Sequence, residues 1–368
     1  MKKVFKKTVS LLLLFVMVIS SLTACGSVDK ANDTSTTKNE SKTEEKKDGA
    51  DTKTDTTAGT DSKKKGYTIA VVPKLTSIAW FQRMEVGVKE YAKDTGIDAF
   101  YTGPSEGDGA LQAQAIEDLI SQGVDAICVV PFSTEALEPV LKKAREAGIV
   151  VITHEAANMQ NIDYDIEAFN NEEYGRHFME RLGELTGGEG EYLLTVGSLT
   201  SASHNQWVDA GKALQEEKFP NMSQYGDKIE TADDQSVAYN KVKEALTANP
   251  NIKAIQGSAM PDIAGAALAV EELGLAGKVQ LVGTSLVSVS GKYVKDGTID
   301  TISFWDPALA GKAMIELAVK VLDGEKIETG LNLGIEGYDK LTLENKVLTG
   351  QAWIDVNKDN VDDPAYGF

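Results

Sequence analysis

Cysteine is nearly absent from this sequence, with two residues in a chain of 368. Cys25 follows an apolar run and Cys128 lies within Ile-Cys-Val-Val, so we expect no disulfide between them. Basic residues are also outnumbered: 37 Lys and Arg stand against 56 Asp and Glu, for a formal charge of −19. This balance opposes binding to a phosphate backbone, and we expect no nucleic acid partner. The length exceeds one ordinary core and indicates two domains.

Motifs of catalysis and of metal binding are missing as well. The sequence contains no Walker A motif, no CxxC pair, no HExxH and no GxSxG. The stretch from Asp355 to Asp363 partly follows a calcium loop but lacks its Gly at position six and its Glu at position twelve. Glu155 and Asp306 could serve as paired glycosidase carboxylates, but nothing favours this over hydroxyl binding. We expect no enzyme, no cofactor and no metal.

The sequence of the first 65 residues indicates a secretion signal followed by a flexible tether. Four lysines precede the apolar run Leu11 to Ile19, which is too short for a membrane span of about 20 residues. Small residues then lead to Cys25, as in the lipobox of bacterial lipoproteins, so we expect a signal peptide at 1–24 and lipidation of Cys25. Residues 27–65 contain no aromatics, Leu or Ile and predict a disordered tether within 25–65. We expect a lipid-anchored protein on the outer face of the cytoplasmic membrane, in a Gram-positive cell.

From residue 66 onward, short apolar runs alternate with stretches of helical periodicity. Strands are expected at 67–73, 98–103, 125–131, 149–153, 192–197, 227–231, 252–255 and 280–283. A polar interval at 158–165 divides the series in two. Repeated βα units imply parallel sheets with helices on both faces, so we predict an α/β fold with two Rossmann-like lobes. Cys128 is expected to be buried in a strand, and His177 to be an ordinary helix residue.

Side chains that follow the strands are the candidate site, because ligands of open α/β sheets bind at the carboxyl ends of strands. Aromatic, amide and charged groups recur there, a chemistry typical of sugar sites, where rings cover the apolar face and polar groups bond the hydroxyls. The predicted ligand-binding residues are Lys74, Trp80, Phe81, His154, Glu155, His204, Asn205, Gln206, Met260, Asp262, Thr284, Trp305 and Asp306.

Several of these residues also have a structural interpretation. Trp80 and Phe81 suit packing of a helix against the core, and Asn205 and Gln206 suit bonds to neighbouring backbone. Pro-Asp at 261–262 fits a helix start, and Asp306 before a proline fits a helix N-cap beside a tryptophan that packs at the hinge.

The whole of residues 67–368 resembles the periplasmic sugar-binding proteins of ABC importers, above all the group of autoinducer-2 receptors and rhamnose-binding proteins. The similar segments are Ile69-Ala-Val-Val-Pro-Lys-Leu75, Trp80-Phe81, Tyr101-Thr-Gly-Pro104, Gln122-Gly-Val-Asp-Ala126, Asn205-Gln-Trp207, Val282-Gly-Thr-Ser285, Phe304-Trp-Asp306 and Asn357-Lys-Asp-Asn-Val-Asp362. The resemblance implies a hinge of three crossing segments, expected near Ala157, Trp305 and Ile335, with the ligand between the lobes. The implied lobes are 66–157 plus 306–335, and 158–305 plus 336–368.

The resemblance also carries expectations for the ligand. Lys74 matches a lysine after the first strand, and Glu155 replaces an acidic residue after the fourth. Ser203, His204, Ser258 and Met260 depart from the autoinducer-2 site, so L-rhamnose or another deoxyhexose is the preferred ligand. The implied function is capture of a monosaccharide by hinge closure and delivery to the membrane permease of an ABC importer, by a monomer. The alternative is a sensor of autoinducer-2 or sugar that presents its ligand to a membrane signalling receptor.

Overall fold

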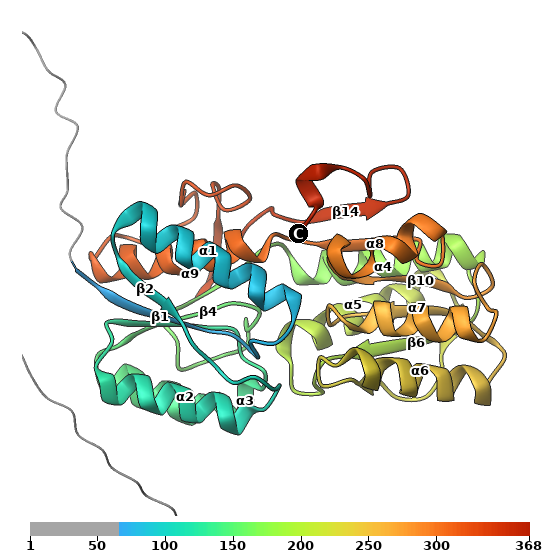
Figure 1. The fold of residues 1–368 in the computed structure, drawn as a ribbon, viewed down its shortest axis with the longest axis horizontal. Helices are drawn as coiled ribbons and strands as arrows, with labels where there is room; N and C mark the ends of the chain where they lie inside the picture. Colours follow the sequence, from blue (N-terminus) through green and yellow to red (C-terminus); the bar gives the residue numbers. More distant parts are fainter. Residues whose placement is uncertain (1–65) are drawn as a thin grey trace, which may run out of the picture. The chain divides into compact units, whose positions relative to one another are not determined.

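Two sheets of seven strands organise residues 66–368, the part of the chain that the computed structural model describes (Figure 1). The expected signal peptide, Cys25 and tether lie outside these residues. Each sheet is largely parallel, with helices on both faces. This confirms the predicted α/β fold of two lobes.

The first lobe is built on the sheet order β12-β13-β5-β4-β3-β1-β2. Helices α1 and α9 pack together on one face of this sheet, and α2 and α3 pack together on the other (Figure 1). The elements are β1 (Thr68–Val72), α1 (Ala79–Thr95), β2 (Asp98–Tyr101), α2 (Gly109–Gln122), β3 (Ala126–Val129), α3 (Thr134–Glu146), β4 (Val150–Thr153), β5 (Tyr164–Glu167), α9 (Pro307–Leu322), β12 (Thr342–Glu344) and β13 (Val347–Thr349).

The second lobe is built on the order β14-β11-β10-β9-β6-β7, with β8 paired to β6. Helices α4 and α5 pack as one pair and α6 and α7 as another. The elements are α4 (Asn171–Thr186), β6 (Glu189–Val196), α5 (Ala202–Lys218), β7 (Asn221–Gln224), β8 (Ile229–Glu230), α6 (Gln235–Ala248), β9 (Ile252–Gly257), α7 (Asp262–Glu272), β10 (Gln280–Thr284), α8 (Val287–Asp296), β11 (Thr301–Phe304), β14 (Ile354–Asn357) and the 3-10 turn η1 (Pro364–Tyr366).

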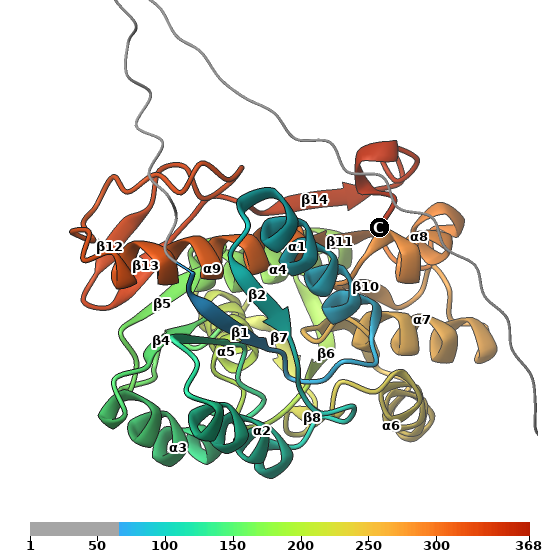
Figure 2. The same cartoon turned by 60° about the vertical axis from the view of Figure 1, so that its left-hand side comes forward.

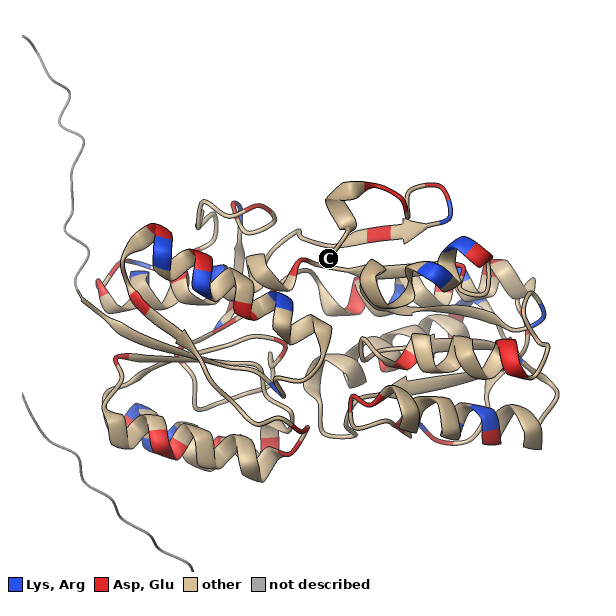
Figure 3. Ribbon diagram, in the orientation of Figure 1, with Lys and Arg blue, Asp and Glu red and all other residues tan. Residues whose placement is uncertain are grey.

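Strand β1 shows why these apolar runs become central strands. Its residues alternate between two hydrophobic clusters: Ile69 and Val71 belong to the cluster that includes α1 and α9, and Ala70 and Val72 to the one with α2 and α3. A strand buried on both faces must be apolar throughout. Strands β1 and β10 accordingly carry no charged residue, and the charged residues lie mainly on helices and loops (Figure 3). Cys128 is fully buried in β3, as predicted.

The chain passes between the lobes at positions that differ in part from those expected. Strand β5 pairs with β4 in the first sheet, so the first crossing follows Glu167 and the expected boundary at 157 is too early. The second passage lies at Trp305, between β11 and α9. The third follows Thr349, because β13 pairs in parallel with β5, and the boundary at 335 is also too early (Figure 2). Both predicted boundaries fail because the two strands are short, four residues in β5 and three in β13, and their place in the first sheet depends on pairing with residues distant in the sequence.

Candidate functional site

Parallel strands of both sheets end at a small internal cavity. Lys74 follows β1 and Glu155 follows β4 in the first lobe, while Met260 follows β9 and Trp305 follows β11 in the second. The cavity is lined by Lys74, Ile78, Trp80, Phe81, Glu155, His204, Trp207, Asp233, Ser258, Met260, Thr284 and Trp305. Eight of the thirteen residues predicted from the sequence are therefore brought together there.

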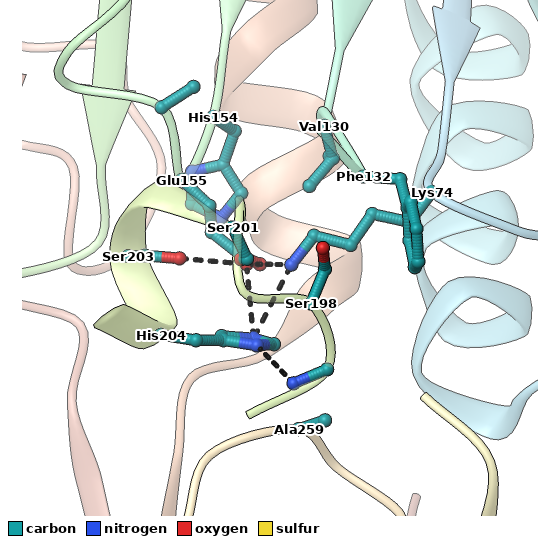
Figure 4. A network of polar contacts seen from close by, with 12 residues as sticks. Lys74, Val130, Phe132, His154, Glu155, Ser198, Ser201, Ser203, His204 and Ala259 are labelled. Atoms are coloured by element: carbon teal, nitrogen blue, oxygen red, sulfur yellow. Dashed lines mark hydrogen bonds and ion pairs between the residues drawn. The ribbon is translucent and has the colours of Figure 1, made fainter. Parts of the chain in front are cut away.

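A buried ion pair lies at the centre of the cavity. The Lys74 ammonium is 2.5 Å from Glu155 Oε2, and each side chain is only 3% exposed. Two residues of the second lobe reach the same pair: Ser203 donates a hydrogen bond of 3.3 Å to Glu155, and His204 Nε2 lies 3.4 Å from Lys74 Nζ (Figure 4). The lobes are thus in polar contact across the site, which describes a closed arrangement.

The charged groups that line the cavity are one ammonium, of Lys74, and two carboxylates, of Glu155 and Asp233. Burial opposes the charge of Lys74, but its pKa is raised overall because the carboxylates of Glu155, Asp233 and Glu167 favour the ammonium. Burial raises the pKa of Asp233 to about 6, and Lys74 opposes that shift. Burial, followed by the charge of Lys74, lowers the pKa of His204 well below its ordinary value. His204 is therefore neutral at neutral pH, and its Nδ1 accepts from Gly197 N at 3.1 Å.

Glu155 is held in its position by an unusual backbone conformation. Its φ is +60°, in the left-handed region that residues other than glycine seldom adopt. The next amide, Ala156 N, donates to Asp165 Oδ1 at 3.2 Å, and this bond helps to hold the backbone turn at Glu155. A strained non-glycine residue retained beside a cavity is typical of functional sites, because surrounding contacts must hold it there.

Aromatic rings form the apolar wall. Trp80 of α1 and Trp305 meet edge to face with ring centroids 4.6 Å apart. Phe81 lies beside Trp80 in the sequence, and Trp207 of α5 lines the cavity from the second lobe. Such rings offer faces for the C–H side of a sugar ring, although here their edges also pack against one another.

His154 lies behind this wall, outside the cavity lining. Trp305 Nε1 donates to His154 Nε2 at 3.0 Å, so that ring nitrogen carries no proton. Nδ1 then bears the proton and faces the carbonyl of Ile166. Burial lowers the pKa of His154, which agrees with a neutral ring. His154 thus orients the indole ring of Trp305 through this hydrogen bond.

Four other predicted residues also lie outside the cavity lining. Asn205 donates from its side chain to the carbonyls of Ser198 and Ser201, at 3.1 and 2.7 Å. Asp306 forms two bonds of 2.9 and 2.6 Å with Arg83 and caps α9. Gln206 lies half-buried on α5. The structural interpretation of Asn205 and Asp306 is the one these contacts favour.

Asp262 is the fourth of these residues, and its carboxylate forms hydrogen bonds within the protein. It accepts from the hydroxyls of Thr195 and Thr231, both at 2.7 Å, and from Ala259 N at 3.1 Å. These bonds tie the start of α7 to the ends of β6 and β8. Burial raises its pKa to about 7.

Asp233 is the charged lining residue that was not predicted from the sequence. It stands in Thr-Ala-Asp-Asp-Gln, which looks like a helix start, and indeed the next residue caps α6 by accepting from Val237 N. The two adjacent carboxylates therefore have different tasks, which only the turn geometry separates. Ile78, Trp207 and Ser258 are also outside the predicted set; Ile78 directly precedes α1 and Trp207 lies on α5, and apolar residues at such positions look like core.

The cavity in this closed arrangement is nearly filled by its own side chains. About 20 Å³ remains, which is room for about one water molecule. Pockets for small ligands usually measure about 300–1,000 Å³. A ligand therefore enters only if the lobes part or the lining side chains move.

The sequence of residues 69–326 matches the description "Periplasmic binding protein domain". The chain belongs to this family. Its members are binding proteins, so the expectation that the chain is not an enzyme is confirmed. Within residues 66–368, no helix is both long and apolar enough to cross a bilayer.

Individual relatives agree with this assignment. The D-xylose-binding periplasmic protein of Escherichia coli is 29% identical over 298 residues, which is 77% of this chain and 84% of that protein. A solute-binding protein of an ABC transporter from Clostridium phytofermentas, solved with bound L-rhamnose, has a TM-score of 0.76 at 23% identity, with 83% of this chain and 99% of that chain covered. LsrB from Clostridium saccharobutylicum in complex with AI-2 has a TM-score of 0.73 at 20% identity, with 80% and 99% covered. The resemblance noted in the sequence is thereby confirmed at the level of the family.

Proposed function

We propose that this protein is a substrate-binding protein that captures a monosaccharide outside the cell and delivers it to an ABC importer. The observation that carries the proposal is the cavity built from both lobes, where the Lys74–Glu155 pair and His204 meet an aromatic wall. Polar groups of this kind bond hydroxyls, and the rings cover the apolar face of a sugar. The names of the relatives support it, since D-xylose-, D-allose- and ribose-binding proteins are among them.

L-Rhamnose or another 6-deoxyhexose is the proposed ligand within this class. Met260 lines the cavity and is 6% exposed, so it offers an apolar neighbour for the methyl group of a deoxy sugar. A hydroxymethyl group at the same place would bury an additional polar group that needs a partner. We further propose that the protein acts as a monomer anchored through a lipid on Cys25, which holds it near its permease.

A thermal-shift screen of the purified protein tests the proposal. A ligand at about 100 times its dissociation constant stabilises the fold by roughly 2.7 kcal/mol, which is readily measured. L-Rhamnose and L-mannose form a matched pair that differs only in the hydroxyl on carbon six. We expect L-rhamnose to give the larger shift; a larger shift with L-mannose would reject the deoxy sugar, and shifts with amino acids alone would reject the sugar class. A dominant response to autoinducer-2 would favour the sensor.

A further inference from the structure

The turn between β8 and α6 has a conformation that its sequence does not favour. Ala232 and Asp233 have φ of 57° and 54°, two successive residues in the left-handed region and neither of them glycine. Ala232 N donates to the carbonyl of Gly197 at 2.7 Å, which fixes the turn against the end of β6. The result is that the side chain of Asp233 lines the cavity while that of Asp234 caps the helix.

Asp233 is largely buried, and its carboxylate, whose oxygens keep some solvent access, receives no hydrogen bond from residues 66–368. Asp233 is 5% exposed, and Lys74 directs its ion pair to Glu155 instead. Asp262, which is fully buried, receives three hydrogen bonds instead. Burying a carboxylate without a hydrogen-bond donor is costly, and among the causes of the pKa shift of Asp233 only the charge of Lys74 favours its charged form.

The neighbouring strand end makes room for this carboxylate. A Cβ atom on Gly197 would lie 2.4 Å from Asp233 Oδ2, so any other residue at position 197 would push the carboxylate away. Gly197 N also donates to His204 Nδ1. One glycine therefore admits Asp233 and orients the neutral histidine beside it.

Asp233 also lies at the junction between the cavity and an open groove. The groove has a volume of about 620 Å³ and shares Ile78, Asp233 and Met260 with the cavity lining. Its other charged lining residues are Glu106 and Asp234, and no Lys, Arg or His is among the described residues that line it. A ligand group in the groove meets carboxylates, whereas Lys74 lies in the cavity lining and pairs with Glu155.

The geometry points to Asp233 as a further ligand-binding residue, one that accepts hydrogen bonds from ligand hydroxyl groups facing the groove. The inference rests on the proposed sugar function and sharpens it, because it requires free hydroxyls at the end of the sugar nearest the groove and disfavours an anionic substituent there. Lys74 and Glu155 come from the first lobe and Asp233 from the second, so a sugar bound by all three joins the lobes. The donors that the carboxylate lacks are then supplied by the ligand.

Three variants of the full-length protein test this role by titration calorimetry with L-rhamnose. Asp233→Asn removes the charge but retains a residue that tolerates the left-handed region. Gly197→Ala keeps the carboxylate and displaces it. Asp209→Asn is the control with the same change of charge, since Asp209 is exposed on α5 of the same lobe, where it pairs with Lys228. We expect at least tenfold weaker binding for the first two and less than a twofold change for the control; a change below twofold in Asp233→Asn would overturn the inference.

Melting temperatures without ligand provide a second, independent readout. If Asp233 serves the ligand, removing its unpaired charge leaves the melting temperature unchanged or raises it. A fall in the melting temperature of Asp233→Asn would assign Asp233 a structural role and overturn the inference. If the wild-type protein binds none of a panel of neutral sugars, the proposed function fails, and the unliganded melting temperatures alone then decide on Asp233: an unchanged or higher melting temperature of Asp233→Asn supports a ligand-facing carboxylate, and a lower one rejects it.

Discussion

Lys74 and Glu155 depend on each other in the closed arrangement. Both side chains are 3% exposed, so neither can be solvated if the other is removed. A buried pair gives little net stability over an apolar substitute, yet a single buried charge left behind is strongly destabilising. The ion pair also preorganises the site for a ligand. Because both charged side chains are already held in place, binding costs little side-chain entropy.

We therefore expect Lys74→Met to lower the free energy of unfolding by about 3 kcal/mol, since it strands Glu155. Glu155→Gln should recover most of that loss when it is combined with Lys74→Met, because the double variant buries no charge. Urea unfolding of the wild type, both single variants and the double variant gives the coupling free energy. Additive effects of the two substitutions would show that the pair is solvated in the unliganded protein.

The residues of the site differ in how far they could be predicted. Lys74, Glu155 and Trp305 follow apolar runs directly, so the sheet topology alone places them at one edge. Asp233 could not be found, because its position depends on the turn at Ala232 and on the space left by Gly197. His154 was assigned to the ligand because it precedes Glu155, yet alternation along the strand turns its ring toward Ile166 and Trp305.

At the scale of elements, Asp262 joins α7 to the ends of β6 and β8 through its three hydrogen bonds. Central strands and helices were predicted well because their apolar periodicity is local. Strands β5, β7 and β11 to β14 were not predicted, because each has only three or four residues and its hydrogen bonds depend on partners that are distant in the sequence. β5 illustrates this, since it contains Asp165 and Glu167 yet is largely buried.

The raised pKa of Asp262 makes the stability of this junction depend on pH. Burial raises its pKa to about 7 from about 3.9 in an unfolded chain, so its contribution is complete below pH 4 and is lost as the pH rises through 7. We expect the free energy of unfolding to fall between pH 4 and pH 7, where the folded carboxyl keeps its proton and the unfolded one has lost it, and to fall less in Asp262→Asn. Urea unfolding at both pH values measures the difference, with Asp209→Asn as the control that keeps the wild-type slope. Equal slopes in Asp262→Asn and the wild type would contradict the assignment.

At the scale of the molecule, contacts beside the second crossing hold the lobes together away from the cavity. Arg83 of α1 binds Asp306, and its guanidinium carbon lies 4.4 Å from the ring centroid of Phe368. Phe368 in turn packs against Phe304 of β11, with ring centroids 5.8 Å apart. A helix of the first lobe is thus latched to the sheet of the second.

Loss of this latch should favour the open arrangement. We expect Arg83→Ala to increase the radius of gyration of the unliganded protein and to weaken ligand binding several-fold, because more of the binding energy is then spent on closure. Small-angle scattering with and without a saturating sugar measures both states. Lys312→Ala, which removes a surface ion pair with Glu90 on the same helix layer, is the control. An unchanged radius in Arg83→Ala would show that the latch has no part in closure.

The late arrival of β13 has a consequence for how the chain folds as it is synthesised. Until Val347–Thr349 emerges, β5 is an edge strand whose unpaired backbone groups can recruit another chain. Asp165 and Glu167 lie on that edge, and inward-facing charges are a known deterrent to such pairing. Burial raises the pKa of both carboxyls in the finished protein, so they lose their charge more readily once the edge is covered. We therefore expect these two acids to deter pairing with other chains until β13 covers the edge of β5.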